Sequence, residues 1–502
     1  MIEAARIEAL VDDEALAPCL ARIEARMPVG VRPRQLSVRT LVVGMLYALA
    51  DHRPAHLCRV HAALVGLPET DRRRLGVTVD WRGGPHLLTY RQTEYTFSLV
   101  IRALEKDNPD GLPTKVLQEL LDALLETSIE VEHKHASSSL AVDWTDVESF
   151  STRRKKPDGT YADAEAAWGH RKGGGPGEKD ELFFGYYLSL ATMVRDDGQG
   201  AAPELVRRMH LGSPDHDPVP AMVDVLVSMP SSAIALSDVV VDSGYAHRVP
   251  EHFALPLRTA GANLVMDLHP NDRGTQGTHE GAICWHGNLY CPSTPNGLFQ
   301  IAPLPRGATD EEVTAHDARS AELARYKLGR ITATDKDGFH RVACPATMGK
   351  LRCPLRTSSL ALSYSHPEVL SPPEHPPACC TQVTITVPPT VNAKTAQRHD
   401  YPSKAWRRSY ARRSAAERAN ARIKDPATVD VARGWCRVMG LVPMSLFLAC
   451  ALVVRNLAVA DAFSERQRDD ERRAAAGRPP RTRRRRRRTI DDLVGTSADA
   501  SP

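Results

Sequence analysis

The segment from residue 410 to residue 424 carries side chains that could do chemistry together. Four of them, each of a different chemical type, recur at helical spacing: Tyr410, Arg413, Glu417 and Lys424. Their offsets of 0, 3, 7 and 14 residues fall within roughly 60° of one another at about 100° per residue, on one face of a predicted helix over 404–424. A solvated charged face is the plain alternative for such a run. The mixture of types favours a site in which a carboxylate holds a divalent cation and the bases neutralise phosphate.

Two further acids follow predicted buried strands, Asp143 after Ser137–Val142 and Asp242 after Val239–Val241. Together with Glu417 they could converge on two Mg²⁺ or Mn²⁺ ions, which stabilise the attacking and leaving oxygens of a phosphoryl displacement. Asp146 is an alternative to Asp143 as the first acid. We favour Asp143, because side chains three residues apart in a strand point to opposite faces.

These motifs resemble the DDE transposases of bacterial insertion sequences, whose catalytic core is RNase H-like. The helix matches the Y-x2-R-x3-E-x6-K signature of that family at every spaced position. Asp143 in Ala-Val-Asp-Trp-Thr-Asp and Asp242 in Val-Val-Val-Asp-Ser-Gly-Tyr resemble its first two catalytic acids. The segment Ala162–Gly169 and the following Phe184–Tyr187 are also similar. The resemblance runs from about residue 137 to 460, loosely over an insertion.

The resemblance implies a transposase that cleaves DNA at the ends of an insertion sequence and joins the freed 3′-hydroxyl to target DNA. Three residues would be its catalytic metal ligands for Mg²⁺ or Mn²⁺: Asp143, Asp242 and Glu417. Three others would bind DNA phosphates near the scissile bond: Tyr410, Arg413 and Lys424. A homodimer on paired DNA ends is implied by the resemblance alone.

Two other functions stay open at this point. One is an RNase H-like nuclease without strand transfer, and the other is a DNA-binding derivative that has lost catalysis. The complete set of three acids argues against the second, because a decayed copy would be free to lose any of them.

The elements that must position these residues form an α/β chain with an all-helical N-terminal domain over 1–132. Apolar residues recur at helical spacing there, and Thr89 and Gln92 fit a capping box. A DNA-reading helix-turn-helix and a plain helical bundle explain that pattern equally well.

The RNase H-like mixed sheet is expected over 133–269 and 401–463. Further strands and one helix are predicted in its first part: Phe183–Leu190, Glu204–Met209, Pro220–Met229 (helix) and Asn263–Met266. Between the two parts, 270–400 reads as a Cys/Pro-rich β insertion. Its predicted strands are Leu298–Ala302, Gly338–Ala343 and Gln382–Val387.

The insertion holds six of the ten cysteines, and we weigh a structural Zn²⁺ ion against incidental thiols. The spacing fits no C-x2-C knuckle, so thiols without a metal are the favoured interpretation. The cysteines that could supply zinc ligands are Cys284, Cys291, Cys344, Cys353, Cys379 and Cys380, with His286 beside them.

The net charge of +4 conceals a basic tail. Residues 472–490 hold ten arginines and no acid, so the rest of the chain has a net charge of −6. We expect no fixed structure over 464–502. The N-terminus lacks the apolar region of a signal peptide, and the uncharged run Val438–Val454 reads as a buried helix rather than a membrane span. We therefore expect a cytoplasmic protein that makes no membrane contact, and the resemblance to DNA transposases implies that it is nucleoid-associated.

Overall fold

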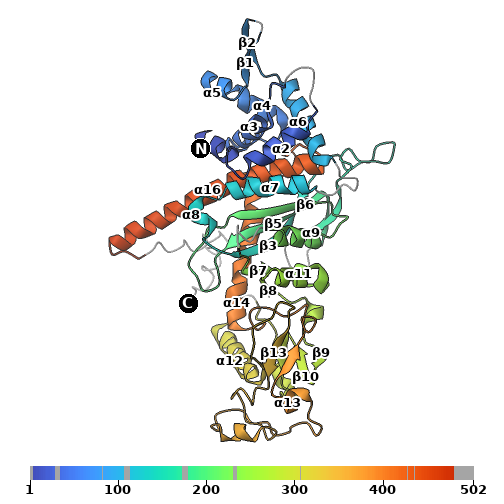
Figure 1. Ribbon diagram of the computed structural model, residues 1–502, viewed down its shortest axis with the longest axis vertical. Helices are drawn as coiled ribbons and strands as arrows, with labels where there is room; N and C mark the ends of the chain where they lie inside the picture. Colours follow the sequence, from blue (N-terminus) through green and yellow to red (C-terminus); the bar gives the residue numbers. More distant parts are fainter. Residues whose placement is uncertain are drawn as a thin grey trace, which may run out of the picture.

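The computed structural model describes residues 4–479 except 29–33, 82, 107–113, 172–178, 230–234, 306, 427, 433 and 435. Along its long axis the N-terminal helices lie at one end, a mixed sheet in the middle and the insertion at the other end (Figure 1). The arginine run 483–488 of the predicted tail lies outside the described residues.

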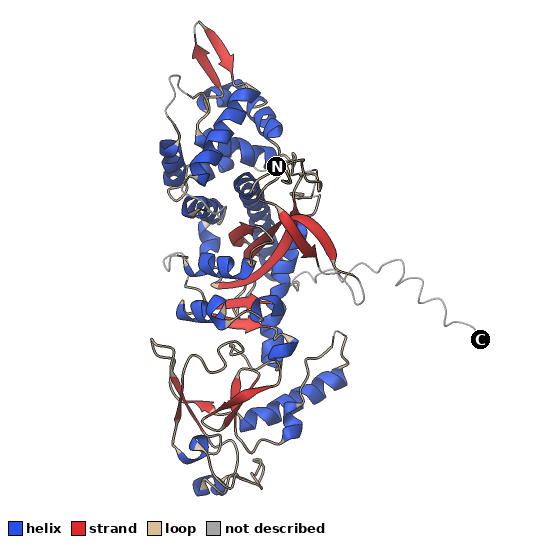
Figure 2. Cartoon of the chain, turned by 90° about the vertical axis from the view of Figure 1, so that its right-hand side faces the viewer, coloured by secondary structure: helices blue, strands red, loops and turns tan. Residues whose placement is uncertain are grey.

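The N-terminal part consists of helices and one β-hairpin, so the prediction that it is all-helical is wrong. The helices are α1 (Ala4–Val11), α2 (Ala17–Arg26), α3 (Val38–Ala50), α4 (Leu57–Val65), α5 (Glu69–Arg74), α6 (Tyr90–Glu105), α7 (Lys115–Thr127) and α8 (Val131–Lys134). The hairpin pairs β1 (Thr78–Trp81) with β2 (Gly84–Leu87) and projects from the far end of the molecule (Figure 2). Gly83 makes its turn possible with a φ of 84°, which a residue with a side chain rarely adopts. The predicted capping box is present, with the Thr89 amide donating to Gln92 Oε1 at 2.8 Å.

The central sheet makes the chain mixed α/β, as predicted. Its strands are β3 (Ser139–Glu148), β4 (Ala167–Arg171), β5 (Glu181–Val194), β6 (Val206–Gly212), β7 (Asp238–Val241) and β8 (Asn263–Met266). β5 lies antiparallel to β3 on one side and to β4 and β6 on the other. β7 and β8 continue the sheet beyond β3, parallel to it. Asp143 therefore lies inside a strand rather than at its end, because β5 pairs with β3 all the way from Ser139 to Glu148.

The two faces of the sheet pack against different helices. Val239 and Val241 belong to a core with α9 (Pro218–Val227) and α11 (Ala254–Thr259). Val240, between them, packs with Ala415 and Ala416 on the opposite face. This alternation is the period-2 pattern of a strand buried on both sides.

The strands predicted at Gly338–Ala343 and Gln382–Val387 are present in shorter form, and the insertion also contains further strands and a long helix that the sequence did not predict. Its elements include β9 (Thr275–His279), β10 (Ala282–Trp285), β11 (Asn288–Tyr290), α12 (Asp310–Tyr326), β12 (Gly329–Arg330), β13 (His340–Ala343), α13 (Ala378–Thr381) and β14 (Ile385–Val387). The strand predicted at Leu298–Ala302 is wrong, since the 3₁₀ turn η3 (Asn296–Phe299) and irregular chain occupy it. The helix α12 carries a capping box of Thr309 and Glu312 that could have revealed it.

The chain then returns to the sheet, and the helix predicted over 404–424 is broken. It consists of α14 (Lys404–Tyr410), the 3₁₀ turn η5 (Ala411–Arg413) and α15 (Ser414–Ile423). The last helix, α16, runs from Leu441 to Ala475. The expectation of no fixed structure from 464 is thus wrong up to Ala475, because α16 continues past its apolar part as a charged helix.

The helix α16 joins the N-terminal helices and the sheet into one hydrophobic core, which includes residues of α3, α7 and β6. It is long and apolar enough to cross a membrane by length and composition, but 89% of its apolar 18-residue window is buried inside the molecule. The apolar part of α16 is therefore a core helix of this fold.

Asn456 is the polar exception within α16, and we expect it to be essential for stability. It is fully buried. Its Oδ1 accepts from the Val206 amide at 2.8 Å and its Nδ2 donates to the Val206 carbonyl at 2.8 Å. Asn456→Leu leaves both peptide groups of this edge strand buried and unpaired, at a cost of about 2–4 kcal/mol. Thermal and urea unfolding should both shift to milder conditions.

The matched control is Gln467→Leu on the exposed part of the same helix, which should leave both transitions in place. Equal stability of Asn456→Leu and the unmodified chain would contradict this role of the buried amide.

Candidate active site

Asp143 lies on the face of β3 that is covered by α15. Its neighbour Ala141 packs with Ala415 and Ala416 of α15. The Asp143 side chain is 14% exposed, and its Oδ1 accepts from the Trp144 amide at 3.0 Å. Burial, with the repulsion of Asp242 added, raises the pKa of Asp143 to about 6, although Arg413 opposes the shift.

Asp242 begins the short helix α10 (Ser243–Ala246) immediately after β7. Its Oδ1 accepts from the amides of Gly244 at 2.9 Å and Tyr245 at 3.2 Å. This leaves Oδ2 for other partners. A Cβ at Gly244 would lie 2.8 Å from the Trp144 ring and 3.0 Å from Asp242 Oδ1, so the Asp-Ser-Gly turn is close-packed against β3.

The buried ion pair of Arg412 and Asp238 fixes the broken helix against the sheet. Arg412 Nη2 lies 2.8 Å from Asp238 Oδ2, and the two side chains are 2% and 0% exposed. Asp238, at the start of β7, also accepts from Arg398 at 2.6 Å. Because Arg412 belongs to η5, this pair holds the turn that presents Arg413, the next residue.

Arg413 brings the three predicted acids together. Its Nη2 lies 3.7 Å from Asp143 Oδ2 and 3.6 Å from Asp242 Oδ2. Its Nη1 donates to Glu417 Oε1 at 2.5 Å. Although burial acts to lower the pKa of Arg413, Tyr410 and the three surrounding carboxylates raise it. The guanidinium therefore stays charged and occupies the centre of the acidic group.

Tyr410 and Lys424 lie at opposite ends of this arrangement. Tyr410 stacks on Trp406 with ring centroids 4.7 Å apart, and burial raises the pKa of its phenol. Lys424 pairs with Asp146 at 3.0 Å rather than with one of the three acids. Asp146 also accepts from Arg171; these bonds lower its pKa, against the raising effect of burial.

Asn420 is a site residue that the sequence analysis missed. Its Nδ2 lies 3.4 Å from Asp143 Oδ2, while its buried Oδ1 has no hydrogen-bond partner. The signal was present, because Asn420 follows Glu417 by three residues and so lies on the same side of α15.

The oxygen donors of the three acids suit Mg²⁺ or Mn²⁺. They surround Arg413 without forming a closed metal cage. In the described part of the chain, groups of three potential ligand atoms within 4.8 Å of one another occur elsewhere: His247, His269 and Asp272, and Glu130, Glu132 and His133.

The cysteines of the insertion are all buried and free. Cys291, Cys344 and Cys353 share one apolar cluster, while Cys284, Cys379 and Cys380 lie in a second. Burial raises the pKa of Cys291 to about 12. Among the described residues no three thiols fall within 4.8 Å of one another. Cys344, Cys353 and Cys380 nevertheless lie near enough to Cys291 to contribute to its raised pKa, so the structural Zn²⁺ ion stays a prediction.

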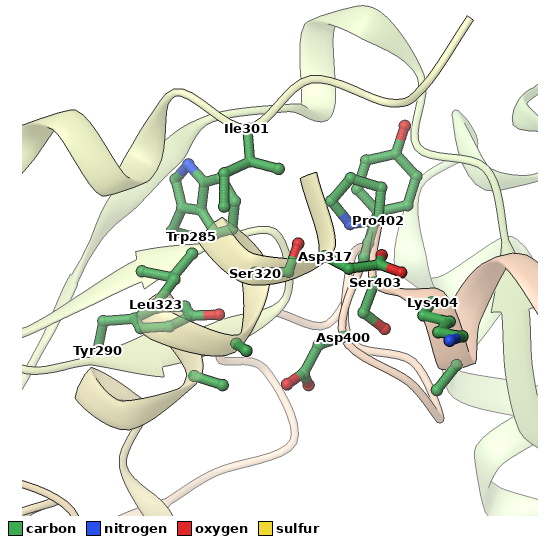
Figure 3. A pocket seen from close by; sticks show the side chains of 14 residues that line it. Trp285, Tyr290, Ile301, Asp317, Ser320, Leu323, Asp400, Pro402, Ser403 and Lys404 are labelled. Atoms are coloured by element: carbon green, nitrogen blue, oxygen red, sulfur yellow. The ribbon is translucent and has the colours of Figure 1, made fainter. Parts of the chain in front are cut away.

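A cavity of about 280 Å³ lies between the insertion and the start of α14 (Figure 3). Trp285, Tyr290, Asp317, Asp400 and Lys404 are among the residues that line it. None of the six predicted site residues lines it.

Comparisons with protein-family models, with curated proteins and with solved structures found no match.

Since Arg413 occupies the position between the acids, we expect it to compete with a divalent cation. In the absence of DNA, Arg413→Ala should bind Mn²⁺ about tenfold more tightly, because roughly 1.4 kcal/mol of charge repulsion is removed. Titration calorimetry or the Mn²⁺ resonance signal measures this directly.

The control is Arg418→Ala on the same helix. The Arg418 guanidinium pairs with Glu204, so its removal should leave the Mn²⁺ affinity unchanged. Weaker binding by Arg413→Ala than by the control variant would show that the guanidinium does not compete with the cation.

Proposed function

We propose that this chain is a DDE-type DNA transposase with a metal-dependent active site. The observation that carries the proposal is the convergence of Asp143, Asp242 and Glu417 on one guanidinium. These acids come from segments 99 and 175 residues apart, and each lies within 3.7 Å of Arg413. Carboxylates rarely gather unless a cation or a reaction requires it.

The order and direction of the strands support an RNase H-like core. The strands β3, β4, β5 and β6 come first in the chain, and β5 is antiparallel to the other three; two crossovers then add β7 and β8 parallel to β3. Asp143 on β3 and Asp242 directly after β7 are thereby neighbours, because these two strands pair in parallel. The helix that carries Glu417 covers the same face.

In this proposal Asp143, Asp242 and Glu417 hold two Mg²⁺ or Mn²⁺ ions. When bound, these ions supply the activation of the nucleophile and the stabilisation of the leaving oxygen. The Asp242 carboxylate is oriented by the α10 amides, and Asp143 by the Trp144 amide, so each keeps its second oxygen toward the site.

The remaining residues of the signature act on DNA phosphate. Arg413, released from the acids, neutralises a phosphate next to the reacting bond. Tyr410 stays protonated because burial raises its pKa, so its hydroxyl can donate to a phosphate oxygen. Lys424 is 36% exposed while paired with Asp146, and its ammonium can reach the backbone further along the strand. The DNA partners would be transposon ends and target, bound by a homodimer.

The decisive experiment uses a supercoiled plasmid that carries the DNA flanking the gene, with Mg²⁺ or Mn²⁺. The unmodified chain should cleave the plasmid and join the ends to target DNA. Glu417→Gln should lower cleavage by about a thousandfold or more, because one metal ligand is weakened. DNA binding in a gel shift should change little.

The control Glu322→Gln alters an exposed acid on α12 and should cleave normally. Cleavage without joining would instead identify an RNase H-like nuclease, and binding without cleavage a catalytically inactive DNA-binding protein. Full activity of Glu417→Gln would refute the assignment of the active site.

A further inference from the structure

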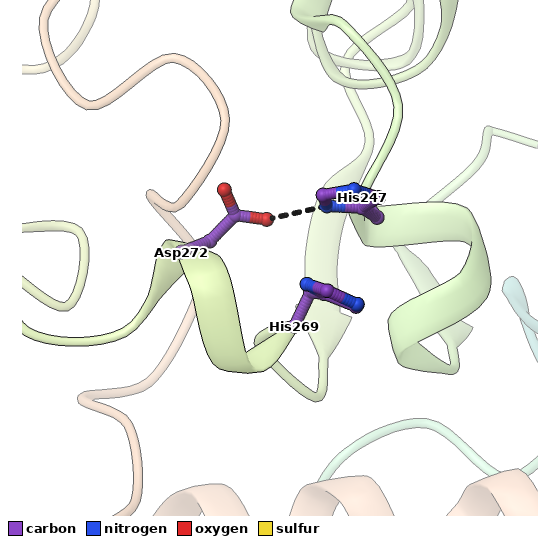
Figure 4. A group of neighbouring side chains, drawn as sticks. All are labelled: His247, His269 and Asp272. Carbon is purple, nitrogen blue, oxygen red and sulfur yellow. Dashed lines mark hydrogen bonds and ion pairs between the residues drawn. The ribbon is translucent and has the colours of Figure 1, made fainter.

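A second group of potential metal ligands lies beyond Asp242 at the same edge of the sheet (Figure 4). His247 directly follows α10, five residues after Asp242. His269 and Asp272 lie at the two ends of the 3₁₀ turn η2 (Pro270–Asp272) that follows β8. Because β7 and β8 are parallel neighbours, both connections leave the sheet at one edge, and this brings the three side chains together.

The spacing within this group is that of ligands around one ion. All three ligand atoms lie within 4.8 Å of one another, and His247 Nδ1 is 3.2 Å from Asp272 Oδ2. Two ligands at about 2.0–2.1 Å from a tetrahedral ion are separated by about 3.3 Å. The rings of His247 and His269 stack with centroids 3.8 Å apart, so the two imidazoles lie side by side.

A positive charge already sits beside two of these ligands. Lys394 Nζ lies 2.8 Å from Asp272 Oδ1 and 3.5 Å from His247 Nδ1. Asp272 is only 8% exposed, so its carboxylate needs a cation close by. The long flexible stem of Lys394 allows the ammonium to withdraw when another cation takes its place.

We infer that His247, His269 and Asp272 bind a transition-metal ion of the Zn²⁺ class. Two imidazoles and one carboxylate suit Zn²⁺ rather than Mg²⁺, which prefers oxygen ligands. The site is thus distinct in chemistry from the three acids around Arg413, and it stands independently of the transposase proposal.

The metal leaves room for a further ligand. A cavity of about 310 Å³ reaches Asp272 and Lys394 and is also lined by Gln276 and Thr278, so a water molecule can complete a tetrahedral ion. Bound there, the metal fastens the first turn of the insertion to α10, whose N-cap is Asp242.

Zn²⁺ titration of the full-length chain by calorimetry tests this inference. The unmodified chain should bind one zinc ion at these residues, and His269→Ala should weaken that binding at least about tenfold. His252→Ala, an exposed histidine in the neighbouring turn, is the control and should bind as the unmodified chain does.

Lys394→Met gives the more discriminating result. Removal of the competing ammonium should strengthen zinc binding about tenfold, whereas a purely structural ion pair would yield no gain in affinity. Zinc binding unchanged in His269→Ala but lost in Cys353→Ser would assign the metal to the thiols of the insertion and overturn the inference. A Zn²⁺ affinity of Lys394→Met that is equal to or below that of the unmodified chain would also overturn the inference.

Discussion

The whole site depends on one electrostatic constraint, the presence of a single guanidinium among three carboxylates. Asp143, Asp242 and Glu417 would repel one another at this separation. The burial of Asp143 strengthens the repulsion that it feels by removing water, whereas Glu417 is half exposed. Burial, with a smaller contribution from the repulsion of Asp242, raises the pKa of Asp143 to about 6. Arg413 offsets the repulsion by facing all three. The same guanidinium chemistry suits phosphate. In the proposed function Arg413 would therefore stabilise the three acids before the metal ions bind and a DNA phosphate afterwards.

The architecture serves to hold that arrangement in place. Arg412 forms a buried ion pair with Asp238 at the start of β7. This pair holds the turn that precedes the helix of Glu417 in a fixed position on the sheet. Small residues of α15, Ala415 and Ala416, let the helix approach the strands closely. Behind them, α16 and the N-terminal helices form the continuous apolar support. At the nearby group of His247, His269 and Asp272, a basic side chain again lies beside a buried carboxylate: Lys394 pairs with Asp272.

Much of the core could be predicted because its signals are local. The strands near residues 183–194 and 263–266 are apolar runs of a length typical of strands. Thr89 and Gln92, three residues apart, form the capping box that begins α6. The errors have equally physical causes. A continuous helix was expected over 404–424 because helical periodicity does not reveal the 3₁₀ turn η5, in which Arg412 pairs with the buried Asp238. The hairpin β1–β2 was missed within the domain predicted to be all-helical, since its strands are short and largely exposed.

The amino-acid sequence by itself determined the chemical types available to the site and their local geometry. The spacing of Arg413 and Glu417 on consecutive turns, and the Asp-Ser-Gly turn that caps α10, follow from neighbouring residues. Only the tertiary structure decided the partners. Lys424 lies against Asp146, Asn420 against Asp143, and His247 beside His269 and Asp272. The contacts of Lys424 and Asn420 join residues 278 and 277 apart in the chain. No local spacing encodes such contacts, because they depend on how the sheet packs against its helices.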